Sequence, residues 1–203
     1  MITVRQAAGN ADAIVPVLAR AFYDDPIWSW LVADPATRIE RLSRVFDPMA
    51  RHVHLPRGLS EVAGRDGATE AVALWDPPGT WRVPLSAQLR QALPLLRAFG
   101  RRTLAAARAL SAMEARHPKR PHYYLAFLAT DPPAQGHGLG GALLRSRLER
   151  CDAERMPAYL ESSKEANVPY YERFGFEVTE RLELPGGCPP VWLMWRDPRP
   201  ADG

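Results

Sequence analysis

The stretch that most constrains this chain runs from Ala126 to Leu144, where an apolar segment, a glycine-rich turn and an amphipathic segment follow one another. Residues Tyr123 to Thr130 are aromatic and apolar, which predicts a buried strand. The prolines after Asp131 end that strand, because proline cannot donate to a ladder. An amphipathic helix is predicted to follow and to run to about Glu154. Between strand and helix the chain carries Gly136, Gly138, Gly140 and Gly141.

A glycine-rich loop that closes onto the start of a helix leaves several backbone N–H groups free on one side. The helix dipole adds partial positive charge at the same place. The loop therefore predicts a diphosphate site. Its glycine spacing differs from the dinucleotide-binding fingerprint, and no Lys-Ser/Thr pair follows as in a P-loop. A turn that only lets strand and helix pack closely is the alternative interpretation.

Composition favours one globular domain with a sizeable core, because 46% of the 203 residues are hydrophobic and 24% are charged. We expect the domain to span residues 1–196 and a flexible tail to span 197–203. The sequence has no run of eighteen apolar residues and no basic-then-apolar start, so we expect a cytoplasmic protein that does not bind membranes. Cys151 and Cys188 lack metal-ligand spacing and are expected to be reduced. No metal is expected, because no ligand set is recognisable among His52, His54, His117, His122 and His137.

Positive charge gathers in one segment of the chain. Residues 82–120 hold nine Lys/Arg and one acid, whereas the whole chain has a net charge of only +3. Such a face suits nucleic acid or an anionic ligand. No nucleic-acid motif accompanies it, so a solvated arginine-rich helix face is the preferred interpretation and no specific nucleic-acid partner is expected.

The patterns predict a mixed α/β chain. They indicate a first strand (1–6), helices at 11–23 and 26–31, a helix from the Asp34-Pro35 cap to about 53, and a hairpin of strands 58–63 and 69–75. A leucine repeat, interrupted by Pro94 and Gly100, predicts helices at about 84–99 and 101–116. After the central strand and its helix come a strand at 158–162, a helix at 166–174 and strands at 176–184 and 191–195.

A second motif lies about thirty residues after the glycine loop. It is Asn167-Val-Pro-Tyr-Tyr171-Glu-Arg-Phe-Gly-Phe176, which follows a strand that ends Leu-Glu161-Ser-Ser. Together with the pattern of Gln135, Gly138 and Gly140 and the order of elements, it resembles the GNAT superfamily of acetyl-CoA-dependent N-acetyltransferases. Within that superfamily, residues from about Arg116 to Arg196 are similar to puromycin N-acetyltransferase-like members.

The resemblance implies a GNAT fold. Its mixed central sheet would have about six to seven strands flanked by helices, with a helical insert before the central strand. It implies acetyl-CoA as cofactor, held by Leu128, Ala129, Thr130, Gln135, Gly136, His137, Gly138, Leu139, Gly140, Gly141, Asn167 and Tyr171. One departure is that many members carry a cofactor-contacting Asn seven residues before the tyrosine, where this chain has Lys164. Asn167, four residues before it, is the candidate for a related role.

Two residues are candidates for the chemistry. Tyr171 would be the general acid, since a tyrosine is protonated at neutral pH and can donate to a departing sulfur. Glu161 would accept the proton of the ammonium. A tyrosine packed in the core and an ordinary surface glutamate are the respective alternatives. A further set is expected either to wall an aromatic substrate pocket with a cation-attracting acid or to form a helix–helix core: Tyr23, Asp24, Asp25, Trp28 and Trp30.

The expected function is transfer of an acetyl group, in a ternary complex, to a primary amine of a small molecule such as an antibiotic-like compound. Acetylation of a protein lysine or N-terminus and a non-catalytic CoA-binding domain are the alternatives. The chain is expected to be a monomer or a homodimer.

Overall fold

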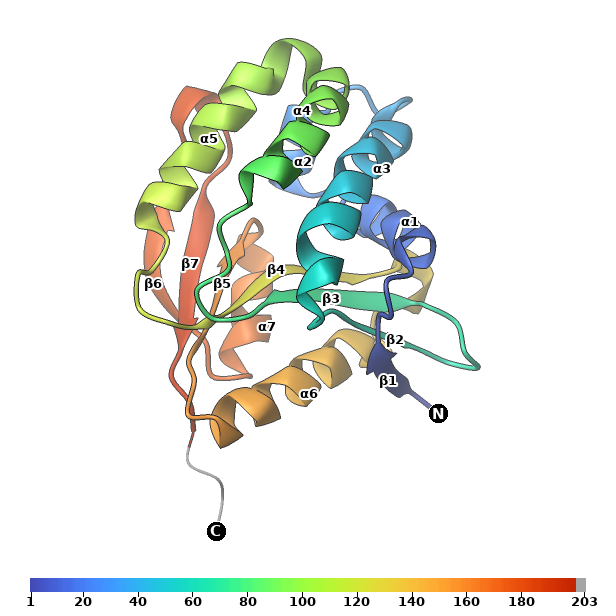
Figure 1. Ribbon diagram of the computed structural model, residues 1–203, viewed down its shortest axis with the longest axis vertical. Coiled ribbons are helices and arrows are strands. Elements are labelled where there is room, and N and C mark those ends of the chain that lie inside the picture. Colours follow the sequence, from blue (N-terminus) through green and yellow to red (C-terminus); the bar gives the residue numbers. More distant parts are fainter. Residues whose placement is uncertain (200–203) are drawn as a thin grey trace.

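The computed structural model describes residues 1–199, and residues 200–203 of the predicted tail lie outside the described residues. Figure 1 shows a sheet with helices on both of its faces. The strands are β1 (Thr3–Gln6), β2 (Glu61–Gly64), β3 (Ala71–Asp76), β4 (Tyr123–Thr130), β5 (Ala158–Ser162), β6 (Glu177–Leu182) and β7 (Val191–Arg196). The helices are α1 (Ala11–Ala21), α2 (Pro26–Leu31), α3 (Arg38–Met49), α4 (Leu85–Phe99), α5 (Thr103–Arg116), α6 (Leu139–Ala153) and α7 (Val168–Glu172).

The seven strands form one sheet in the order β1-β2-β3-β4-β5-β7-β6. Only β4 and β5 are parallel, and the other neighbouring pairs are antiparallel. The predicted mixed α/β fold with a helical insert before the central strand is confirmed. The central strand lies at the predicted residues because its apolar run and its closing prolines are both local signals.

The sheet is split at its parallel pair. β4 pairs with β3 along its length, from Tyr124 to Thr130. It pairs with β5 only at Tyr123–Leu125, opposite Ala158–Leu160. A bulge in the β3–β4 ladder falls where the pairing with β5 stops, between the partners of Leu74 and Trp75, and bulges re-aim a strand in this way. The rest of β4, from residue 126 onward, therefore has an edge without a neighbouring strand.

Helices cover the sheet unequally. In Figure 1, α6 lies on one face and α1 to α5 lie on the other. The core on the α1–α5 side gathers aromatic and aliphatic side chains around Phe46, Leu18 and Leu74. The core on the α6 side packs Leu143 and Leu144 against Trp75 and Leu160. These two apolar layers hold β4 between them, so packing on both faces fixes its position beside β3.

The helix predicted from the Asp34-Pro35 cap begins later than expected. Asp34 accepts hydrogen bonds from the Ala36 N–H and the Thr37 hydroxyl, which makes a tight turn, and α3 starts only at Arg38. Its continuation, Ala50–His54, is a π-helical turn. Such turns are rare and frequently mark functional sites.

The helical insert leaves its leucine repeat facing outward. Leu85, Leu89, Leu93 and Leu96 are each more than half exposed, whereas Ala87, Gln91 and Ala98 of α4 are buried. The spacing correctly predicted helix, but it does not say which face packs. No helix within residues 1–199 combines the length and apolar character that a membrane span requires. Both cysteines are free and buried, and burial raises the pKa of the Cys151 thiol to about 12.

Candidate active site

A cavity of about 1210 Å³ opens where β4 and β5 separate. Its lining includes β4 from Tyr124 to Thr130, the glycine loop, the end of β5 and the inner side of α5. The two sequence motifs, the glycine loop and the segment from Asn167 to Phe174, therefore border one space. Small-molecule pockets usually measure about 300–1,000 Å³, so this cavity has room for a small molecule.

The glycine loop presents a row of free donors to this cavity. Within residues 1–199, no hydrogen bond occupies the backbone N–H groups from Gly136 to Gly141. Gly136 and Gly138 adopt the left-handed φ values of +80° and +81°, which only glycine takes without strain. A Cβ on Gly140 would lie 3.0 Å from the Tyr170 hydroxyl. These observations fit a diphosphate group held by the loop and the start of α6.

Cationic side chains flank the loop. Arg145 lies 3.4 Å from where a Cβ of Gly141 would sit, and Arg173 lies 5.2 Å from the centre of the Tyr170 ring. Both arginines line the cavity. Tyr170 and Arg173 were not among the sequence-predicted site residues, because the closing motif alone does not show which of its side chains turn toward the loop.

The other predicted cofactor residues line the same cavity, except His137, whose Nδ1 lies 3.2 Å from the Ala134 carbonyl oxygen. Leu128, Ala129 and Thr130 lie on the unpaired edge of β4. The Gln135 amide donates to the Thr130 carbonyl at 3.2 Å, which ties the loop to the strand. Asn167 is exposed at the start of α7 and also lines the cavity. Their contacts with a cofactor remain predictions.

Tyr171 lies at the edge of the cavity and is 9% exposed. Burial is the main cause that raises the pKa of its hydroxyl above the usual value of 10, so it keeps its proton throughout the neutral and mildly alkaline range. Two other tyrosine hydroxyls are paired with carboxylates: Tyr123 donates to Glu154 and Tyr124 donates to Glu161. Tyr171 has no such partner within residues 1–199, and its proton is available to a ligand.

Glu161 lies at the cavity wall, held by side chains from two other segments. The Tyr124 hydroxyl donates to its Oε2 at 2.6 Å. Nδ1 of His117 lies 3.5 Å from its Oε1. The side chain is only 6% exposed, so the carboxylate is fixed and largely dry. It is not an ordinary surface glutamate.

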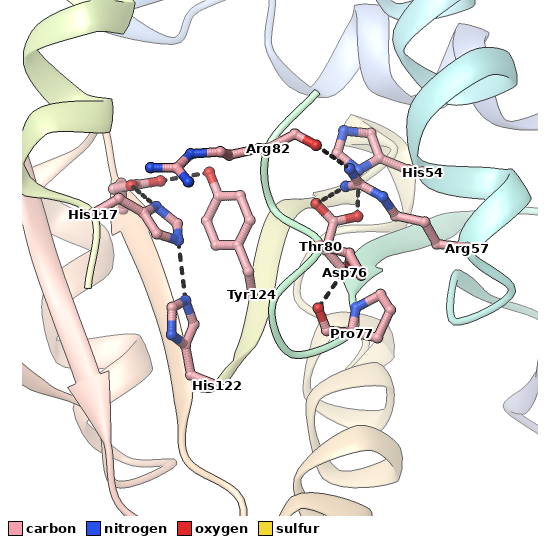
Figure 2. A network of polar contacts seen from close by, with 10 residues as sticks. His54, Arg57, Asp76, Pro77, Thr80, Arg82, His117, His122 and Tyr124 are labelled. Atoms are coloured by element: carbon pink, nitrogen blue, oxygen red, sulfur yellow. Dashed lines mark hydrogen bonds and ion pairs between the residues drawn. The ribbon is translucent and has the colours of Figure 1, made fainter. Parts of the chain in front are cut away.

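His117 also lines the cavity and connects Glu161 to His122, which does not line it. Its Nε2 lies 3.0 Å from Nε2 of His122, and Nδ1 of His122 lies 2.6 Å from the carbonyl oxygen of Arg120. Trp81 stacks on the His117 ring with centroids 3.9 Å apart. Burial, the largest cause, lowers the pKa of His122 below its usual 6.5. Figure 2 shows His117 above His122, beside Tyr124, with the contact between their two rings as a dashed line.

A second histidine–carboxylate pair lies on the other side of Tyr124 (Figure 2). Nδ1 of His54 lies 2.8 Å from Oδ1 of Asp76, and Arg57 forms an ion pair with Oδ2 of the same carboxylate. Asp76 is fully buried. His54 comes from the π-helical turn, lines the cavity and packs on Phe127 with ring centroids 5.6 Å apart.

Aromatic side chains form much of the remaining wall, but the predicted set is only partly right. Trp28 lines the cavity and packs on Phe46 and Phe127. Trp30 and Tyr23 do not line it, because they stack on Arg102 and Arg38 respectively.

Of the two aspartates before α2, only Asp25 lines the cavity, and Asp24 is exposed elsewhere. Asp25 caps α2 by accepting from the Ile27 and Trp28 N–H groups, and Ser163 donates to its other oxygen. Burial, the largest cause, raises its pKa. Both carboxylate oxygens of Asp25 already accept hydrogen bonds, so its main role is to cap α2.

The structure thus combines a split mixed sheet, a glycine loop at a helix start and a cavity between them. The sequence profile described as Acetyltransferase (GNAT) family matches residues 73–176, and the chain belongs to this family. The protein is an N-acetyltransferase of the GNAT type. The resemblance to its puromycin N-acetyltransferase-like members is not confirmed.

Similar proteins span the whole chain. An uncharacterized N-acetyltransferase of Schizosaccharomyces pombe is 27% identical over 98% of this chain and 84% of its own length. A Corynebacterium glutamicum structure, described as histone acetyltransferase HPA2 and related acetyltransferase, is 29% identical with a TM-score of 0.75 and covers 100% of this chain and 99% of that one. The PaiA N-acetyltransferase of Thermoplasma acidophilum in complex with coenzyme A has a TM-score of 0.59 at 13% identity, covering 97% and 99%.

Proposed function

We propose that the protein transfers the acetyl group of acetyl-CoA directly to a primary amine of a small molecule. The observation that carries this proposal is the shared cavity: the free N–H groups of the glycine loop, the carboxylate of Glu161 and the hydroxyl of Tyr171 all border one space. Family membership gives the reaction class, and the cavity gives the residues that would perform it.

Each step falls to a group of the chain. The N–H groups of Gly136 to Gly141, together with Arg145 and Arg173, would hold the diphosphate. When bound, acetyl-CoA supplies an activated thioester. Glu161 would take a proton from the substrate ammonium, because only the neutral amine attacks a carbonyl. Tyr171 would donate its proton to the departing sulfur, and burial keeps that proton on the hydroxyl until it is needed.

The cavity favours an acceptor with an apolar or aromatic body and one cationic end. Its wall carries Phe22, Trp28, Phe127 and Met113, while Glu114 and Glu161 supply negative charge away from the arginines of the loop. An aromatic aminoacyl amine, the kind of compound that the puromycin N-acetyltransferase-like resemblance implies, is the first acceptor to test. Because α5 lies along the cavity, a small molecule suits the space better than a folded protein segment.

The binding half of the proposal is tested by thermal unfolding with acetyl-CoA. At a concentration one hundred times its Kd, a ligand that binds only the folded chain adds about 2.7 kcal/mol, or roughly 5–10 °C in Tm for a chain of this size. Gly138→Glu should lose this rise, because a carboxylate fills the phosphate space. Gly67→Glu is the matched control, since Gly67 has a similar φ of +80° but lies in the β2–β3 turn.

The catalytic half is tested with a panel of small amines and lysine peptides, with thiol release as the signal. Release with aromatic or aliphatic primary amines supports the proposal. Turnover restricted to peptides would place the protein among protein acetyltransferases. A Tm rise with acetyl-CoA but no release from any acceptor would leave only a CoA-binding domain.

A further inference from the structure

The contacts behind Glu161 indicate which ring nitrogen of His122 and of His117 carries a hydrogen. Nδ1 of His122 lies 2.6 Å from the carbonyl oxygen of Arg120. A carbonyl oxygen only accepts, so this nitrogen carries a hydrogen and donates it. Since a neutral imidazole has one donor and one acceptor nitrogen, Nε2 of neutral His122 is an acceptor.

This assignment fixes His117 in turn. Its Nε2 lies 3.0 Å from the acceptor nitrogen of His122 and must therefore be the donor. The Nδ1 of a neutral His117 then has a lone pair, and it faces Oε1 of Glu161 at 3.5 Å. The other carboxylate oxygen already accepts from Tyr124. Two acceptors face each other across this gap, and the network has room for one more proton.

The surroundings keep this proton position apart from bulk water. The His117 side chain is 3% exposed, with the Trp81 ring stacked on it and the rings of Tyr124 and Tyr159 at its edges. The titratable groups in direct contact are therefore Glu161, His122, Tyr124 and Tyr159. Charges on the neighbouring segments are Arg82, which lies over the Trp81 ring, Glu114 on α5, and Arg116, which pairs with Glu180 at 3.8 Å.

The reaction itself leaves one proton over. An ammonium that becomes an amide loses two protons, and the thiol that leaves takes up one. If Tyr171 gives its proton to the sulfur and regains one from the substrate nitrogen, a single proton must be held elsewhere. The number of protons to be held equals the number that the gap can accept.

We propose that His117, acting through Glu161, stores the proton that the substrate ammonium gives up, between Oε1 of Glu161 and Nδ1 of His117. The N–H bond of the ammonium breaks, its electron pair stays on nitrogen, and the proton bonds within the gap. The network changes from a net charge of −1 to neutral, and the proton passes to solvent after the product leaves. His122 is a positioning residue, because its bond to the Arg120 carbonyl sets the tautomer of His117.

The first test needs no substrate and is independent of the proposed function. Nitrogen-15 NMR of histidine-labelled, ligand-free protein reports which ring nitrogen of each histidine carries hydrogen. We expect His122 protonated on Nδ1 and His117 on Nε2 at neutral pH. On acidification, His117 should gain its second proton at a higher pH in the wild type than in the Glu161→Gln variant. At intermediate pH, the ring is then doubly protonated in the wild type and still neutral in the variant. His52 and His137 should titrate alike in both proteins.

Two NMR results would overturn the proposal. One is a His117 ring that already carries both protons in the ligand-free protein at neutral pH, since the store would be full before the reaction. The other is a His117 ring that titrates identically in wild type and Glu161→Gln, since the proton would not be shared.

The second test uses the acceptor found in the amine panel, and this part rests on the proposed function. In single-turnover reactions with a pH-indicator dye, proton release from wild type should lag behind thiol release. In His117→Asn the lag should vanish and kcat should fall about tenfold with the KM for acetyl-CoA unchanged. Wild-type timing and rate in this variant would refute the store while leaving the acetyltransferase activity in place. Conversely, the expected NMR result without turnover of any amine would support the proton position and refute the proposed function.

Discussion

Two histidine–carboxylate pairs flank Tyr124, and they use the same chemical groups to different ends. In the Asp76 pair, the carboxylate is fully buried and has two partners, His54 and Arg57. In the Glu161 pair, the carboxylate borders the cavity, and its closest partner is the neutral Tyr124 hydroxyl. The first carboxylate is neutralised by a permanent cation, and the second is not. Burial and partner charge, rather than residue type, separate a structural pair from a candidate base.

Among the substitutions that test this comparison, we expect the largest effect from the loss of the Asp76 carboxylate, which should lower the stability of the fold. Asp76→Ala leaves the Arg57 guanidinium, whose side chain is only 10% exposed, without a carboxylate and with the Arg82 carbonyl as its remaining acceptor. It should lower the free energy of unfolding by about 3–5 kcal/mol. Glu161→Ala removes a carboxylate that faces a cavity and should cost roughly 1–2 kcal/mol. Urea unfolding of both variants measures the difference. Equal losses would mean that the two pairs are equally structural.

Kinetics should show the opposite ranking. Glu161→Gln is expected to lower kcat/KM about one hundredfold at neutral pH, with part of the loss recovered as pH rises and free amine accumulates. His54→Asn keeps a donor for Asp76 and should stay within about threefold of wild type. The pH–rate profiles of both variants decide between the two pairs. A larger loss in His54→Asn would transfer the role of base to His54.

Tyr171→Phe completes this kinetic comparison, because it removes an acid rather than a base. It should lower kcat by about ten- to a thousandfold with no recovery at high pH. Since burial raises the pKa of Tyr171, the wild-type rate should show no alkaline decline from this group below about pH 10. A wild-type rate in Tyr171→Phe would mean that the thiol leaves without its help.

The smallest expected effect is the contribution of His122, which lies behind Glu161, to the loss of folding stability at low pH. The folded chain lowers the pKa of His122, and unfolding returns it to about 6.5. Below that pH the unfolded chain binds more protons, so stability is lost as pH falls toward the folded value. His122→Asn should reduce this dependence by an amount on the order of 1 kcal/mol, measured as urea midpoints between pH 7 and 5. An unchanged slope would show that His122 does not contribute.

Sequence alone predicted the parts of the molecule that local patterns determine. The central strand, the glycine loop and the strand that ends at Ser162 lie where apolar runs, prolines and glycines placed them. Tyr171 and Glu161 were found through motifs, and the structure places both at the cavity. The identity of the cofactor contacts stays a prediction.

The histidine pairs were not predicted, because no local signal marks them. His54 and Asp76 lie 22 residues apart. His117 belongs to a loop, whereas its partner Glu161 lies near the end of β5. Only the pairing of β3, β4 and β5 brings these segments together. Likewise, the helical spacing of the leucines in α4 did not reveal that they face outward, since spacing defines a face but not its neighbour.

The short ladder between β4 and β5 has a mechanical consequence. Three residues of one strand face three of the other, and on either side of this seam the sheet is continuously antiparallel. A small rotation of one half-sheet against the other therefore strains few hydrogen bonds, yet it changes the width of the gap between them directly. Hydrogen exchange should locate the most readily opened amides of the sheet along this seam, because few hydrogen bonds join the two half-sheets there.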